Sequence, residues 1–206
     1  DPPGAEALFA GLGLTGRRVF LTVGRLSAAE LYKVHDRVIA ALPVVRQAHP
    51  SAAYLIVGDG DDIPRLKALA RSLGLSDAVV FAGHLESAML PGVLRAADVF
   101  VMPSTGEGFG IVFVEAAAAG LPVIGGNRDG SCDALADGAI GALVDPLDQS
   151  QLVAAMTAAL EGRIVANPEA AARFAPEHFA RHVDGLIEIA FSGLNAHANR
   201  GRTRTR

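Results

Sequence analysis

Short apolar runs alternate along this chain with longer stretches in which apolar residues recur at helical spacing. Strands are predicted for residues 19–23, 54–57, 79–81, 99–102, 123–124 and 142–144. Helices are predicted for residues 36–48, 64–73, 87–97, 111–119, 151–160 and 177–191. Continuously apolar strands separated by helices are typical of a parallel sheet that is covered on both faces. The pattern therefore predicts an α/β fold with a doubly wound parallel sheet.

The limits of this pattern predict one domain over residues 17–192, with C-terminal helices from about residue 148. Residues 1–16, which begin Asp-Pro-Pro-Gly, are predicted to be a linker. Residues 193–206 carry four arginines without apolar periodicity, so we expect a basic, disordered tail. The alternative for this tail is a weak contact with anionic lipid headgroups. The chain does not begin with Met and is interpreted as a piece of a longer protein.

Composition narrows the class of protein. Half of the 206 residues are hydrophobic, which is a globular composition. Aromatic residues make up 5% and the net charge is −4, so both the stacking of single strands and a broad nucleic-acid surface are disfavoured. The single cysteine, Cys132, excludes an internal disulfide framework and favours a reducing compartment. No stretch reaches the roughly 18 apolar residues of a membrane span. We therefore expect a cytoplasmic protein, with peripheral contact to the inner face of the membrane as the only membrane association.

Cationic residues follow the first predicted strand, at the edge where doubly wound sheets bind ligands. Gly24 and Arg25 come directly after this strand, and Lys33 lies eight residues further on. Glycine allows close approach of a ligand to the backbone, while arginine and lysine are suited to phosphate. The alternative is that both cations are ordinary solvated surface charges.

Glycine pairs follow the next two predicted strands. Gly58 and Gly60 form a G-x-G turn, but Ile63 stands where a dinucleotide fingerprint needs a third small residue, which disfavours NAD binding. Gly83-His84 follows the third strand, and His84 is either a contact to a nucleoside or a solvated loop residue. The chain also lacks the G-x-x-x-x-G-K-[ST] loop of nucleotide hydrolases.

The strongest signal is the glycine-rich turn from the strand at 99–102 into the helix at 111–119. The backbone N–H groups of Gly108, Phe109 and Gly110 are predicted to lie at the helix N-terminus, where donors and the helix dipole favour anions. Glu107 precedes the helix, and Glu115 follows about two turns later. Carboxylates at these places are suited to sugar and ribose hydroxyls. The alternative reading makes Glu107 a capping acid and Glu115 an exposed helix residue.

Glu107-x7-Glu115, together with the glycines between them, resembles the signature of the retaining glycosyltransferases of family 4, which have a GT-B architecture. An ordered series of further motifs extends the resemblance over roughly residues 18–162. These motifs are Val23-Gly-Arg-Leu26, Glu30-Leu-Tyr-Lys33, Ile56-Val-Gly-Asp-Gly60, Val80-Phe-Ala-Gly83, Ala97-Asp-Val-Phe-Val-Met-Pro-Ser104, Gly120-Leu-Pro-Val-Ile124 and Gly141-Ala-Leu-Val-Asp-Pro146. The resemblance implies that the chain is the Rossmann-like, C-terminal half of such an enzyme, the half that binds the nucleotide-sugar donor.

The resemblance also implies residue roles. Arg25, Lys33 and Glu107 are the implied catalytic residues: the two cations neutralise the donor diphosphate, and Glu107 holds the transferred sugar. Glu115 is the implied ribose ligand. The implied donor-binding residues are Gly24, Arg25, Lys33, Gly58, Gly60, Gly83, His84, Glu107, Gly108, Phe109, Gly110, Ile111 and Glu115. Neither a metal nor a cofactor is implied, because Arg, Lys and helix N–H groups supply the positive potential. The implied chemistry is glycosyl transfer with retention at the anomeric carbon.

The stretch Gly24–Asp36 is most similar to exopolysaccharide mannosyltransferases of the acetan and xanthan type. This similarity implies transfer of α-mannose from GDP-mannose to a lipid-linked oligosaccharide, with a UDP-sugar donor as the alternative. Two departures bear on activity. The family usually has Gly where this chain has Val34, which predicts a strained loop or a crowded diphosphate. The acceptor-binding, N-terminal half is also absent from this chain, so we expect donor binding but little or no transfer by the chain alone. A non-catalytic nucleotide- or partner-binding module of the same fold is the alternative function.

Overall fold

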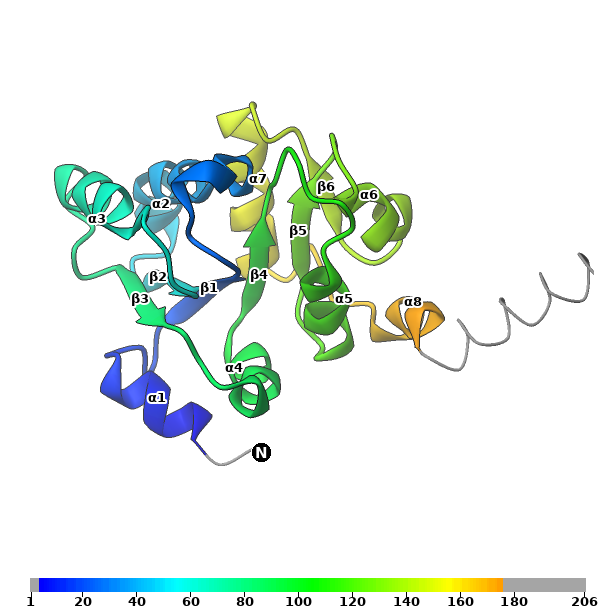
Figure 1. The fold of residues 1–206 in the computed structure, drawn as a ribbon, viewed down its shortest axis with the longest axis horizontal. Coiled ribbons are helices and arrows are strands. Elements are labelled where there is room, and N and C mark those ends of the chain that lie inside the picture. The colour runs from blue at the N-terminus through cyan, green and yellow to red at the C-terminus, as the bar shows by residue number, and fades with distance from the viewer. Residues whose placement is uncertain (1–3, 176–206) are drawn as a thin grey trace, which may run out of the picture.

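The sheet of this protein has six parallel strands in the order β3-β2-β1-β4-β5-β6 (Figure 1). The structure is a computed structural model that describes residues 4–175. The strands are β1 (Arg18–Val23), β2 (Ala52–Val57), β3 (Val79–Gly83), β4 (Val99–Met102), β5 (Val123–Gly126) and β6 (Ala142–Val144). This order reverses between β1 and β4, as in Rossmann-type sheets. The predicted doubly wound parallel sheet is confirmed.

Helices cover both faces of this sheet. The α-helices are α1 (Ala5–Gly11), α2 (His35–Ala48), α3 (Ile63–Ser72), α4 (Leu90–Ala96), α5 (Ile111–Ala118), α6 (Ser131–Ala134), α7 (Gln149–Leu160) and α8 (Pro168–Ala171). The described residues also form the 3₁₀ segments η1 (Ala28–Lys33), η2 (Ser87–Met89) and η3 (Ala136–Gly138), which lie between α-helices, and η4 (Ala172–Phe174), which follows α8. The helix predicted for residues 177–191 and the basic tail predicted for residues 193–206 lie outside the described residues.

The hydrophobic core is divided by the sheet into two layers. Phe20 and Tyr54 point to the layer that contains α2, α3 and α7, whereas Leu21 and Leu55 point to the layer that contains α1, α4, α5 and α6. All six residues of β2 are buried. Because successive strand residues face opposite layers, burial of both faces requires a continuous apolar run, which is the pattern in the sequence.

The prediction of a linker over residues 1–16 is wrong from residue 5 onward. Residues 5–11 form α1, and the chain packs on the core through Phe9 and Leu14, which are 8% and 1% exposed. Leu8, Phe9 and Leu12 recur at helical spacing, which is the signal for this helix. The linker prediction gave more weight to the two prolines that precede it. Within residues 4–175, no helix is long and apolar enough to cross a membrane.

Candidate functional site

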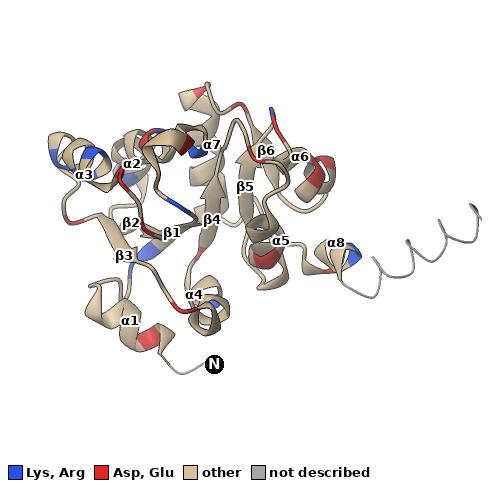
Figure 2. Cartoon of the chain, in the orientation of Figure 1, with Lys and Arg blue, Asp and Glu red and all other residues tan. Residues whose placement is uncertain are grey.

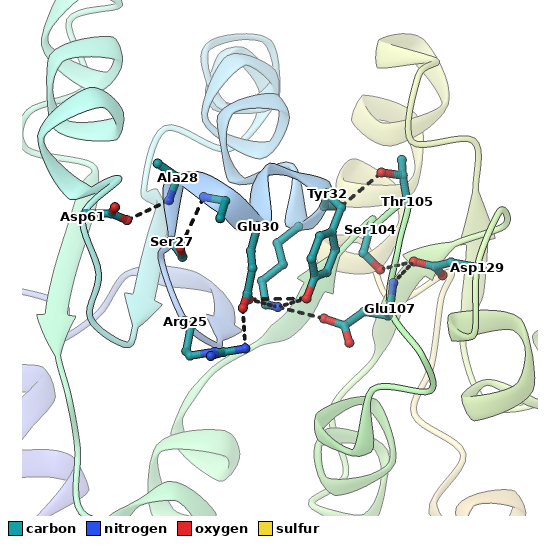
Figure 3. Close-up of polar contacts among 12 residues, drawn as sticks. Arg25, Ser27, Ala28, Glu30, Tyr32, Asp61, Ser104, Thr105, Glu107 and Asp129 are labelled. Atoms are coloured by element: carbon teal, nitrogen blue, oxygen red, sulfur yellow. Dashed lines mark hydrogen bonds and ion pairs between the residues drawn. The ribbon is translucent and has the colours of Figure 1, made fainter.

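Arg25, Lys33 and Glu107 meet beyond the carboxyl ends of β1 and β4, where the strand order reverses (Figure 3). The Nζ atom of Lys33 lies 3.1 Å from Oε1 of Glu107. The same Nζ atom lies 2.9 Å from Oε2 of Glu30. The other oxygen of Glu30 forms an ion pair with the Arg25 guanidinium. The structure thus brings three predicted residues together and links the two cations through a fourth, Glu30.

The loop that carries both cations is held by local hydrogen bonds. The side chain of Ser27 accepts a hydrogen bond from Ala29 N, and Asp61 accepts one from Ala28 N at 2.7 Å, which together fix the start of η1. Within η1, Glu30 has the non-helical dihedrals φ −115° and ψ 40°. The Tyr32 hydroxyl lies 2.9 Å from the Lys33 Nζ atom, on the side of the cluster that faces the β4–α5 loop.

The cluster pairs two basic side chains with two acidic ones. The Lys33 side chain is only 9% exposed, and those of Glu30 and Glu107 are 14% and 15% exposed. Burial by itself would lower the pKa of Lys33, but its hydrogen bonds to Tyr32, Glu30 and Glu107 outweigh burial and raise that pKa. The hydrogen bond from Lys33 in turn lowers the pKa of Glu30, against the opposing effect of burial. The Lys33 charge is therefore preserved at neutral pH.

Glu107 faces Lys33 and is not a helix cap. Helix α5 begins after Gly110, which has the left-handed dihedrals φ 81° and ψ 70°, and no side chain caps it. The capping alternative for Glu107 is therefore wrong. The Phe109 ring packs edge-on against the Phe174 ring, with the ring centroids 5.3 Å apart. Gly108 is exposed, and the Ile111 side chain is 69% exposed at the first position of α5.

Two hollows lie on this part of the molecule, and only the first is lined by a residue of the ion-pair cluster, Arg25. The first, of about 350 Å³, is lined by ten residues, among them Gly24, Arg25, Gly58 and His84. The second, of about 420 Å³, is lined by Glu115 and shares Ser87 and Leu90 with the first. The predicted nucleoside residue His84 and the predicted ribose ligand Glu115 therefore open onto neighbouring hollows, although both side chains are exposed. Gly60 and Gly83 line neither hollow.

The glycines of the β2–α3 loop are required by contact with the β1–η1 loop. A Cβ atom on Gly58 would lie 1.9 Å from the carbonyl oxygen of Gly24, and one on Gly60 would lie 2.1 Å from that of Leu26. Their φ values are +139° and +157°. Loop packing thus accounts for both glycines, whether or not a ligand approaches them.

Val34 has the left-handed conformation that the usual glycine would provide, with φ 49° and ψ 39°. A β-branched residue in this region is strained. The residue is 9% exposed and directly follows Lys33, so the strain is located at the base of the cation loop. The strained loop expected from the sequence is present.

Sequence reasoning gave no role to Glu30, Tyr32 or Asp129. Glu30 is three residues before Lys33, a spacing that brings helical side chains together and could have identified it. Asp129 accepts a hydrogen bond from Glu107 N at 2.7 Å, but it lies in a different loop and no local pattern marks that pairing.

Charges elsewhere on the described residues are interspersed. Figure 2 shows basic and acidic segments alternating over the helices and loops in this view, rather than one extended basic face. Among residues 4–175, no three His, Cys, Asp or Glu side chains cluster as a metal site would require.

Residues 5–178 match the protein family described as glycosyl transferases group 1. The chain belongs to this family. It is 36% identical over 179 residues to a GDP-mannose-dependent α-(1-6)-phosphatidylinositol monomannoside mannosyltransferase of Mycolicibacterium smegmatis, covering 84% of this chain and 45% of that protein. It is 39% identical over 158 residues to a glycogen synthase of Mycobacterium tuberculosis, covering 77% of this chain and 37% of that protein.

Solved glycosyltransferase structures share the architecture. Anabaena HepE in complex with UDP and glucose superposes with a TM-score of 0.77 at 25% identity, over 91% of this chain and 53% of that chain. Sucrose-phosphate synthase from Thermosynechococcus elongatus superposes with a TM-score of 0.75 at 28% identity, over 91% and 49% of the two chains. This group 1 glycosyltransferase chain spans less than half the length of the two curated relatives named above.

Proposed function

We propose that this chain is the donor-binding domain of a retaining hexosyltransferase. The observation that carries the proposal is the convergence of Arg25, Lys33 and Glu107, with Arg25 also lining the first hollow. Two linked cations, one of which lines a cavity of nucleoside size, suit the diphosphate of a nucleotide sugar. A carboxylate within reach of the same place suits the hydroxyls of the sugar.

In this proposal, Arg25 and Lys33 neutralise the negative charge that develops on the departing diphosphate. The backbone N–H groups of residues 108–110 add donors at the start of α5. Glu107 accepts hydrogen bonds from the transferred sugar, and Glu115 accepts them from the ribose. The acceptor hydroxyl attacks the anomeric carbon from the face that the diphosphate leaves, through an oxocarbenium-like transition state, so that the anomeric configuration is retained. The bond from the anomeric carbon to the acceptor oxygen forms as the bond to the diphosphate oxygen breaks, and the departing diphosphate takes the hydroxyl proton. Neither a metal nor a cofactor takes part in these steps.

We propose GDP-mannose as the donor and a lipid-linked oligosaccharide of exopolysaccharide assembly as the acceptor, at the inner face of the membrane. The relative named as GDP-mannose-dependent supports the donor, as does the sequence of the loop at residues 24–36. HepE, which was solved with UDP and glucose, favours a UDP-sugar as the second candidate.

A non-catalytic nucleotide-binding module is the alternative function. The strained Val34 beside Lys33 is the observation that favours it, because a branched side chain there replaces the usual glycine. Transfer by the protein that contains both halves would exclude this alternative.

Calorimetric titration of the chain with GDP, UDP and ADP, with and without Mg²⁺, tests the proposal. We expect metal-independent binding, strongest for GDP. Arg25→Ala and Lys33→Ala should weaken GDP far more than guanosine, because only GDP carries the diphosphate. If both variants weaken the two ligands equally, neither cation binds phosphate. If no nucleotide binds, the donor-domain proposal is wrong for this chain.

A further inference from the structure

The backbone of Glu107 is held by the loop between β5 and α6. Oδ2 of Asp129 accepts a hydrogen bond from Glu107 N at 2.7 Å. The next residue, Gly130, donates its N–H to the carbonyl oxygen of Glu107 at 2.9 Å. Both polar groups of the Glu107 main chain are therefore bound by two consecutive residues of another loop.

Two serines complete the environment of the Asp129 carboxylate. Ser104 Oγ donates to Oδ2 at 2.8 Å, and Ser131 N donates to Oδ1 at 2.9 Å. Both serines are fully buried. Burial would raise the pKa of Asp129, but the hydrogen bonds from Ser131, Glu107 and Ser104 outweigh it and lower that pKa. An ionised carboxylate only accepts hydrogen bonds, so all three donors hold it in one orientation.

The two loops are in direct backbone contact. A Cβ atom on Gly130 would lie 2.1 Å from the carbonyl oxygen of Gly108, so that no other residue fits there without moving the Glu107 loop. Arg128, on the other side of Asp129, forms a two-point ion pair with Asp145 at 2.8 and 2.6 Å. That pair is directed away from Glu107, onto the residue that follows β6.

We propose that Asp129 is a positioning residue for Glu107. Its carboxylate fixes the loop at residues 104–107 so that the Glu107 side chain faces Lys33 and, in the donor complex, the transferred sugar (Figure 3). The orientation of Glu107 toward the transferred sugar rests on the proposed function. The fixing of the Glu107 loop by Asp129 is independent of any ligand.

The Asp129→Asn variant tests the proposal. Asparagine has one acceptor oxygen and a donating NH₂ group, which would face Glu107 N–H or Ser131 N–H. We expect the affinity for a nucleoside diphosphate to change by less than twofold, while the ratio of nucleotide-sugar affinity to nucleoside-diphosphate affinity falls about five- to tenfold. Asp145→Asn is the matched control, because it removes the same charge from the neighbouring ion pair and should leave the ratio unchanged.

Ser104→Ala removes one donor to the same oxygen and should lower the ratio in the same direction by a smaller factor. This second variant is informative if Asp129→Asn does not fold. An unchanged ratio in a folded Asp129→Asn variant would overturn the proposal. An equal loss of both affinities would also overturn it, since Asp129 would then only support the fold.

Hydrogen exchange of the Glu107 amide tests the positioning role of Asp129 independently of the proposed donor-binding function. We expect the Glu107 amide to be protected in the parent chain and to exchange at least tenfold faster in Asp129→Asn, with no change in Asp145→Asn. If the parent chain binds no nucleotide but this exchange pattern holds, the donor-domain function is wrong and Asp129 still fixes Glu107. Unchanged exchange of the Glu107 amide would overturn the positioning role itself.

Discussion

The ammonium of Lys33 and the carboxylate of Glu107 lie 3.1 Å apart, although they come from the loops after β1 and β4. Both side chains are largely buried, at 9% and 15% exposure. The cation proposed to bind diphosphate is therefore paired with the carboxylate proposed to bind sugar. A diphosphate that takes Lys33 competes with Glu107 for it, and displacement would free Glu107 for the sugar.

Replacing Glu107 with Gln should therefore strengthen binding of the nucleoside diphosphate alone. Gln keeps the size of the side chain but removes the charge that competes for Lys33. A hydrogen bond to a charged group is worth about 1.5–3 kcal/mol, of which only part is released here, so we expect a roughly three- to tenfold gain. Calorimetric titration of GDP and UDP measures it.

Glu86→Gln is the matched control for this gain. Glu86 is exposed and lies between Leu85 and Ser87, which line the first hollow, so its loss changes the charge near the site without freeing Lys33. We expect its effect to be small and to vanish at high salt. Weaker diphosphate binding by Glu107→Gln would contradict the competition between Glu107 and the ligand.

Because Val34 has a left-handed conformation, glycine should be more stabilising than alanine at this position, the reverse of their order within a helix. Val34→Gly and Val34→Ala both remove the branched side chain, but only glycine adopts φ 49° without strain. We expect the Gly variant to exceed the Ala variant in unfolding free energy by about 1 kcal/mol. Urea denaturation of both variants measures the difference.

Val38, a buried residue inside α2, provides the reference for this comparison. There the Ala variant should be the more stable by about 1 kcal/mol, since glycine is unfavourable within helices. The same order of stability at both positions would mean that Val34 is not strained in solution.

The sheet could be predicted from the sequence because its strands are apolar on both faces and are separated by periodic helices. Arg25, Lys33 and Glu107 could be singled out as candidates because each follows a strand, and parallel strands place their carboxyl ends at one edge. Their roles came from the resemblance to a family. Glu30 was missed as a partner of both cations, although its spacing of three residues from Lys33 could have indicated that contact; its ion pair with Arg25 has no such local signal. Asp129 was missed because its partner Glu107 lies in a loop distant along the chain, and only the folded structure shows that contact.

Substituting Gly58 with Ala should disrupt the lining of the first hollow. The new Cβ atom would lie 1.9 Å from the Gly24 carbonyl oxygen, so one of the two loops must move. We expect a loss of unfolding free energy of about 2–4 kcal/mol, from backbone overlap added to strain at φ +139°. Nucleotide affinity, measured by calorimetry, should fall with it because Gly24 and Arg25 line that hollow.

Gly74→Ala is the control that introduces backbone strain without the steric overlap expected at Gly58. Gly74 has φ +69°, but a Cβ atom there meets nothing within 4 Å. Only the strain of about 1 kcal/mol should appear, without any change in nucleotide affinity. Equal destabilisation at Gly58 and Gly74 would show that the β1–η1 and β2–α3 loops adapt freely.

Because His35 is buried, we expect the free energy of unfolding to decrease in mild acid. The residue is 5% exposed, its Nδ1 atom lies 3.2 Å from the Tyr54 hydroxyl, and burial, aided by the Lys33 charge, lowers its pKa to about 4. An unfolded histidine titrates near pH 6.5, so between these values the unfolded chain binds more protons than the folded one. The contribution of neutral His35 is therefore complete above about pH 6.5 and decreases as the pH falls toward 4.

Urea denaturation at pH 7 and pH 5 measures this contribution. Relative to a His35→Gln variant, the parent chain should lose about 2 kcal/mol of unfolding free energy between the two values. The comparison cancels the acidic groups that also titrate in acid, such as Asp129, because both chains contain them. His84→Gln, at an exposed position, should follow the parent chain. If the parent and His35→Gln lose stability in parallel, His35 is not held neutral by the fold.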